Sequence, residues 1–144
     1  MIGLICLMLL SSTEGYAEDK DDRWVPYGKT ESGEYFYYKT NRPIVTTKTL
    51  RVWEKIKYSK LEKERVIKVI TNSDKPKEGY NKLDFSSFLC EISCIDKTTK
   101  VIKSVQYNDE GKIIEVFDFT SPQTHQILPN TIDELLLNAI CQKK

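Results

Sequence analysis

The sequence predicts a single α+β domain, in which a β-sheet is covered on its apolar face by a C-terminal helix. Most segments between residues 23 and 119 are rich in aromatic and β-branched residues and alternate in polarity, as strands do. Apolar residues near the C-terminus recur at helical spacing. The composition, with 40% hydrophobic and 30% charged residues among 144, fits one globular domain.

The N-terminus has the layout of a cleavable signal peptide. Residues 2–10 form an apolar run that is too short to span a bilayer, and Gly15 and Ala17 precede a cleavage site before Glu18. We therefore expect a signal peptide over 1–17, a flexible leader over 18–22 and one domain over 23–144. A buried N-terminal strand or helix is the alternative. Export predicts a periplasmic, secreted or cell-surface protein without a transmembrane segment in the mature chain.

Six segments have the composition and alternation typical of strands. Pro26 places the first at a sheet edge or a bulge. The turn between the last two is 108–111, where Gly111 can adopt a positive φ. In the fifth segment, the alternation of strand side chains places Val101 and Val105 on the same face. The six segments are 23–29, 34–39, 46–58, 83–95, 100–107 and 112–119.

The third of these strands divides clearly into two faces. One parity is mainly apolar and is expected to face the core. It consists of Leu50, Val52, Ile56 and Tyr58. The opposite parity is basic apart from one tryptophan, and consists of Arg51, Trp53, Lys55 and Lys57.

Two helices are predicted, each beginning at a capping box. The first covers about residues 60–70 after Ser59, but its apolar stripe is imperfect, so a strand stays open as the alternative. The second covers 131–141 and begins at Thr131 with acidic residues in its first turn. Its apolar face, expected to lie on the sheet, consists of Ile132, Leu135, Leu136, Ala139 and Ile140.

Three cysteines follow the predicted signal peptide: Cys90, Cys94 and Cys141. Cys90 and Cys94 cannot bond to each other, because four residues of a strand span about 13 Å and bridged Cα atoms lie within about 7 Å. A bond from that strand to Cys141 would pin the last helix to the sheet, and oxidising compartments favour such bonds. Three buried free thiols are the alternative. A metal site lacks support, since His125 is the single histidine.

No catalytic or cofactor motif is recognisable. The sequence lacks a nucleophile elbow, a phosphate-binding loop, a Rossmann fingerprint, a zinc-protease motif and a haem-attachment motif. We therefore expect no enzyme activity and no cofactor. The net charge of +1 predicts no general affinity for nucleic acid.

Basic residues concentrate in one stretch of the chain. Residues 46–70 contain eight lysines and arginines against three glutamates. From them we predict a candidate binding surface for a protein or an acidic glycan, with a solvated face as the alternative. An open sheet edge could also support a homodimer. The candidate surface consists of Arg51, Trp53, Lys55, Lys57 and Arg65.

Six short motifs occur in a recognisable order: Trp24, Tyr35–Tyr38, Arg51–Trp53, Glu91–Cys94, Tyr107–Gly111 and Pro129–Cys141. Taken together, these motifs resemble the surface-adhesin protein E family of Gram-negative bacteria. They span nearly the whole chain after the predicted signal peptide. The resemblance implies a curved antiparallel sheet of about six strands with the C-terminal helix on its concave face. It also implies a Cys94–Cys141 disulfide, with Cys90 free as a departure from the family pattern.

The resemblance also implies a function in binding. The family is named after a surface protein that binds host extracellular-matrix and serum components. We therefore expect an exported, non-catalytic cell-envelope module that binds proteins or matrix. A periplasmic structural or accessory protein without an adhesive role is the alternative. No binding residue carries over from the family to this chain.

Overall fold

The computed structural model describes residues 23–39, 49–73 and 78–141. The predicted signal peptide, the leader and the first residues of the predicted third strand lie outside the described residues. The strands are β1 (Trp24–Lys29), β2 (Tyr35–Lys39), β3 (Thr49–Lys57), β4 (Leu83–Ser93), β5 (Thr98–Asn108), β6 (Ile113–Asp118) and β7 (His125–Gln126). The helices are α1 (Lys60–Thr71) and α2 (Ile132–Cys141), and η1 (Tyr80–Lys82) is a 3₁₀ turn.

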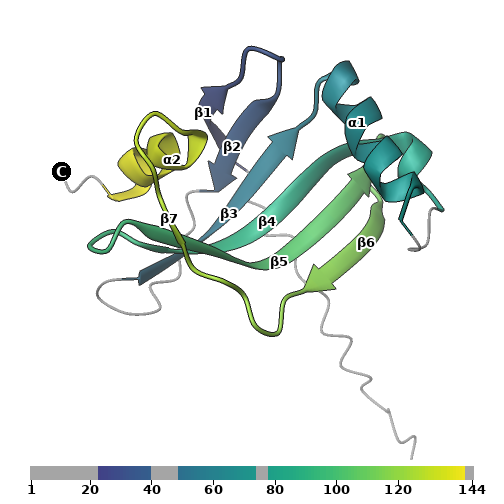
Figure 1. Cartoon of the computed structure of the whole chain (residues 1–144). Helices are drawn as coiled ribbons and strands as arrows, with labels where there is room; N and C mark the ends of the chain where they lie inside the picture. Colours follow the sequence, from purple (N-terminus) through teal and green to yellow (C-terminus); the bar gives the residue numbers. More distant parts are fainter. Residues whose placement is uncertain (1–22, 40–48, 74–77, 142–144) are drawn as a thin grey trace, which may run out of the picture.

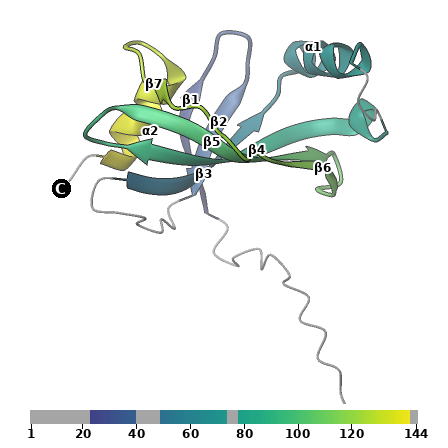
Figure 2. The ribbon, with the colours of Figure 1, turned by 60° about the horizontal axis from the view of Figure 1, so that its bottom comes forward.

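The strands form one antiparallel sheet in the order β1-β2-β3-β4-β5-β6, and β7 pairs with β5. Each strand from β2 to β6 therefore lies beside its predecessor in sequence, which short connections favour. The sheet curls into an open half-barrel (Figure 1), and both helices stand on the same, concave side of it (Figure 2). The predicted fold class, an antiparallel sheet with a C-terminal helix on its concave face, is confirmed.

The edge strand β1 contains the irregularity that Pro26 predicts. The register between β1 and β2 shifts between Pro26 and Gly28. Gly28 lies directly under α2, and a Cβ atom at this position would lie 3.2 Å from Cδ1 of Ile132 and 3.4 Å from Cδ1 of Leu135. The absence of a side chain therefore allows the helix to approach the edge of the sheet closely.

A second register shift changes which side chains of β5 face the core. It lies between Leu89 and Cys90 of β4, so that Val101 is opposite Cys90 while Val105 is opposite Ser87. Val101 packs against the core under α2. Val105 lies on the other face, so the expected common face of the two valines is wrong. A bulge inserts one residue into the alternation, and its position depends on the neighbouring strand.

Helix α2 covers a core on the concave face that includes Tyr38, Val52, Cys90, Ile92 and Ile127. The predicted helix face is partly wrong. Its buried residues are Leu136, Leu137 and Ile140, whereas Leu135 is 46% exposed and Ala139 is also exposed. Leu137 lies one helical turn before Cys141, so the bond that turns Cys141 toward the sheet turns Leu137 toward it as well.

A disulfide joins Cys94, just after β4, to Cys141 at the end of α2. The two Cα atoms are 5.6 Å apart, within the usual range for such a bond. Cys90 is free and buried. The expected pairing is confirmed, and it closes a loop across 47 positions of sequence.

The segment after β3 is a helix rather than a strand. The backbone N–H of Glu62 donates to Oγ of Ser59 at 3.1 Å, which is the predicted cap. Unlike α2, α1 buries none of its side chains fully. It therefore stands on the sheet without being packed deeply into it.

Candidate functional site

Four of the five residues of the predicted binding surface lie together on the convex face of the sheet, opposite α2. Val52 and Glu54 of β3 are buried toward the core, and the residues that alternate with them project to the other side. These residues are Arg51, Trp53, Lys55 and Lys57, and in β4 they face Glu91, Leu89, Ser87 and Phe85, respectively. The sheet register therefore places them in one row.

Lys55 is the centre of a cluster of aromatic rings on the convex face. Its Nζ lies 4.3 Å from the ring centroid of Phe85, 5.4 Å from that of Trp24 and 5.9 Å from that of Tyr37. These three rings come from β4, β1 and β2. Such cation–π contacts hold the ammonium in place over apolar surface.

The cluster extends in both directions across the sheet. Nζ of Lys39 lies 4.9 Å from the Trp24 ring, and Phe85 stacks on Tyr107 with centroids 4.5 Å apart. The aromatic–lysine patch therefore runs from β1 to β5. Aromatic rings beside basic side chains are the residue types enriched where proteins bind one another. The patch consists of Trp24, Tyr37, Lys39, Lys55, Phe85 and Tyr107.

Arg51 belongs to a network of ion pairs at one end of the row. Its Nε lies 3.1 Å from Oε2 of Glu91, and Nζ of Lys100 lies 3.1 Å from Oε1 of the same carboxylate. Burial alone would raise the pKa of Glu91, but the hydrogen bonds from Lys100 and Arg51 and their charges lower it below its ordinary value. Glu91 thus stays ionised and orients the Arg51 side chain.

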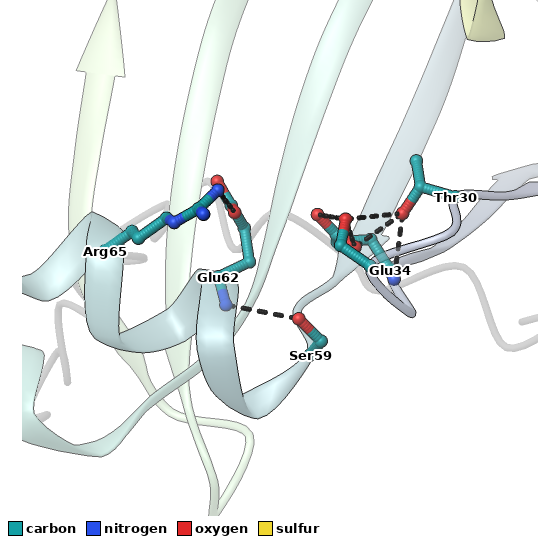
Figure 3. Close-up of polar contacts among 6 residues, drawn as sticks. Thr30, Glu34, Ser59, Glu62 and Arg65 are labelled. Atoms are coloured by element: carbon teal, nitrogen blue, oxygen red, sulfur yellow. Dashed lines mark hydrogen bonds and ion pairs between the residues drawn. The ribbon is translucent and has the colours of Figure 1, made fainter.

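The structure separates Arg65 from the other four residues. Arg65 lies on α1, on the helix side of the sheet, with Nη1 3.4 Å from Oε2 of Glu62 (Figure 3). The carboxylate of Glu34 accepts hydrogen bonds from Thr30 and Ser32, which together with the charge of Arg65 lower its pKa. Arg65 is therefore part of a polar cluster between α1 and the β1–β2 hairpin.

Sequence reasoning missed a buried polar cluster beneath α2. Glu54 is 8% exposed and accepts hydrogen bonds from the Tyr27 hydroxyl and, at 3.7 Å, from the Cys90 thiol. Burial raises the pKa of Glu54, the nearby charge of Asp133 adds to the rise, and the two hydrogen bonds oppose it. The sequence did contain one indication of this cluster. Glu54 lies in β3 between the core positions Val52 and Ile56, so the alternation of the strand directs its side chain toward the core.

This buried cluster is suited to structure rather than to nucleophilic chemistry. Burial raises the pKa of the Cys90 thiol well above its ordinary value, and Glu54 raises it further. Burial and Glu54 likewise raise the pKa of Tyr27. A protonated, buried thiol is a poor nucleophile. The three side chains therefore satisfy each other's hydrogen bonds under the helix.

We expect the variant Glu54→Gln to stabilise the protein in a pH-dependent way. Because the pKa of Glu54 is raised by folding, its contribution to stability is present at low pH and is lost as the pH rises through the folded pKa. The amide keeps the shape without a charge: its oxygen can accept from Tyr27, and its NH₂ group can donate to the sulfur of Cys90. The free energy of unfolding in urea should rise at pH 8 and stay unchanged near pH 4. A pH-independent loss of stability would contradict the raised pKa.

Two further observations concern the part of the chain that the structure describes. No group of three His, Cys, Asp or Glu side chains in it is arranged to hold a metal ion. No helix in it combines the length and the apolar character needed to cross a bilayer. His125 lies exposed on the short strand β7.

The described residues form a small domain with an open sheet, two helices on its concave side and a disulfide that fixes the last helix. The model of the surface-adhesin protein E family matches residues 24–142. The chain belongs to this family. No curated protein and no solved structure matched in the other two comparisons. Membership indicates an exported or surface protein of an adhesin-like, non-enzymatic kind.

Proposed function

We propose that this protein is an exported binding module that attaches to extracellular or matrix proteins through the convex face of its sheet. Residues 1–17 act as the signal peptide in this proposal, and the mature domain is exposed at the cell surface. Family membership supports an adhesive role. The row Arg51, Trp53, Lys55 and Lys57 together with the aromatic–lysine patch forms the binding surface.

The arrangement around Lys55 is the observation that carries this proposal. Three aromatic rings from three different strands lie within 6 Å of one ammonium group. A lysine in solution loses side-chain entropy when a partner immobilises it, whereas a lysine already held by rings loses less. The surrounding rings supply apolar contact area, and the ammonium supplies a charge that selects an acidic partner.

The concave face is less suited to the same task. Helix α2 and the Cys94–Cys141 disulfide cover the core there. Among residues 23–39, 49–73 and 78–141, no helix lies on the convex face, as Figure 2 shows. A partner can therefore dock on the convex face without displacing any described element of the fold.

Charge reversal at two neighbouring positions of β3 tests the proposal. We expect the double variant Lys55→Glu/Lys57→Glu to bind an immobilised basement-membrane extract at least about tenfold more weakly than the wild type. The cause is the loss of the cation–π contacts and of attraction to acidic partners. The measurement is biolayer interferometry at low and high salt, because screening should weaken the wild-type signal.

Arg65→Glu is the matched control. It reverses the charge of a residue that the sequence assigns to the same surface but that lies on the helix side of the sheet. It should leave binding within about twofold of the wild type. Circular dichroism verifies that all variants fold. Equal loss in both variants, or no binding by the wild type, would refute the convex face as the adhesive surface. Complete competition by heparin would assign the surface to acidic glycans instead of proteins.

A further inference from the structure

A groove separates α1 from the concave face of the sheet, away from the convex binding surface. Its volume is about 270 Å³. Val66, Val69 and Ile70 of α1 form one wall, and Phe117 of β6 forms another. Figure 2 shows α1 standing above the sheet, on the same side as α2.

The groove exists because α1 is incompletely packed. The helix has 12 residues and buries none of them fully, and Val69 is 71% exposed. Helix α2, which is shorter, buries three side chains on the same sheet. Interiors normally fill such space, since unfilled apolar surface forfeits dispersion and hydrophobic stabilisation. An apolar ligand in the groove would restore these contacts.

The floor of the groove is polar and largely prearranged. Tyr58 forms a hydrogen bond of 2.8 Å with Ser86, whose hydroxyl also donates to Gln106. Tyr80 is 2% exposed and donates its hydroxyl to Glu115. Burial raises the pKa of both tyrosines, so both phenols stay neutral donors at physiological pH.

Glu115 is the only charged residue among the described residues that line the groove. Tyr80 occupies one position on its carboxylate, Oε2. A carboxylate accepts about four hydrogen bonds, so Glu115 can receive further donors. The groove thus combines apolar walls with one negative acceptor, a combination that complements a molecule with an apolar body and a positive end.

We propose that this groove binds a small organic amine. The ammonium group donates to the carboxylate of Glu115, and the hydrocarbon body packs against Val66, Val69 and Phe117. The volume is adequate, since a cavity of about 150 Å³ holds a benzene molecule, and the groove has room for an aromatic ring with a short aminoalkyl chain. This site is separate from the proposed adhesive surface, so either can fail without the other.

Three probes of nearly equal shape test the charge requirement: 2-phenylethylamine, 2-phenylethanol and 3-phenylpropionate. We titrate each into the disulfide-bonded, ¹⁵N-labelled domain and follow the amide resonances of α1 and β6. The amine should bind at least about tenfold more tightly than the alcohol, because only the amine forms a charge-assisted hydrogen bond. The acid should bind more weakly than either. Equal binding of all three probes, or no shift by the amine, would overturn the proposal.

Two variants locate the effect. Glu115→Gln should reduce the affinity for the amine to that for the alcohol, while Glu110→Gln, at an exposed hairpin carboxylate paired with Lys112, should change neither. Val66→Phe fills the groove from the helix side and should abolish binding of both probes while the domain stays folded. Undiminished binding of the amine to Glu115→Gln or to Val66→Phe would place the amine elsewhere and contradict this site.

Discussion

Replacing both bridged cysteines, in the variant Cys94→Ser/Cys141→Ser, is expected to lower the free energy of unfolding by about 4 kcal/mol. The disulfide closes a loop across 47 positions, and removing it restores to the unfolded chain the conformations that the closed loop excludes. The folded state also loses the bond that fixes the end of α2 over the core. Both effects act in the same direction.

Urea unfolding followed by tryptophan fluorescence measures this change. Both cysteines are replaced because a single replacement would leave one free thiol. That thiol could form a non-native disulfide with Cys90. The wild-type protein in reductant is the matched control and should unfold at the same urea concentration as the variant. If the oxidised wild type, the reduced wild type and the variant unfold together, the disulfide does not stabilise the domain.

The variant Leu136→Ala is expected to cost about 3 kcal/mol of stability. Leu136 is 2% exposed and belongs to the core between α2 and the sheet. Truncation removes apolar contact area and leaves a cavity that the rigid half-barrel cannot close. Its neighbour Leu135 is 46% exposed, so Leu135→Ala should cost less than about 1 kcal/mol.

This pair of variants tests the orientation of α2 as well as its contribution. The same side chain is truncated at two consecutive positions, so helix propensity and composition change equally. Thermal unfolding of the oxidised domain at one pH gives both differences. Equal destabilisation by the two variants would mean that the apolar face predicted from spacing alone, which contains both Leu135 and Leu136, is the one that packs.

The sequence predicted most of the strands because their signals are local. The turn at Asn108–Gly111 depends on a glycine with positive φ, and Gly111 has a φ of 76°. Pro26 marked the irregular edge strand, and Ser59 marked the start of α1. Each of these features is determined by the residues beside it, so it is visible without knowledge of the fold.

The features that the sequence left unpredicted depend on neighbours distant in the chain. The bulge that turns Val101 toward the core arises from pairing with β4, and alternation within β5 alone does not contain it. The rotation of α2 toward Leu137 follows from the bond made by Cys141. A buried carboxylate at Glu54 is tolerated because Tyr27 and Cys90 donate to it from β1 and β4.

The candidate surface likewise depends partly on residues that are neighbours in sequence and partly on residues far apart in the chain. Alternation in β3 placed Arg51, Trp53, Lys55 and Lys57 on one face. The aromatic rings that surround Lys55 come from three other strands, so only the strand order brings them together. Arg65 is close to this surface in sequence, but the chain crosses to the helix side of the sheet before it reaches Arg65.

Site-specific photocrosslinking tests whether partners dock on the convex side of the sheet. Benzoylphenylalanine replaces Trp53 on the convex face or, in a second preparation, Ala139 on the exposed side of α2. After irradiation with basement-membrane extract, docking on the convex face predicts covalent adducts from the Trp53 position and none from the Ala139 position. Adducts formed only from α2, or from neither position, would contradict it.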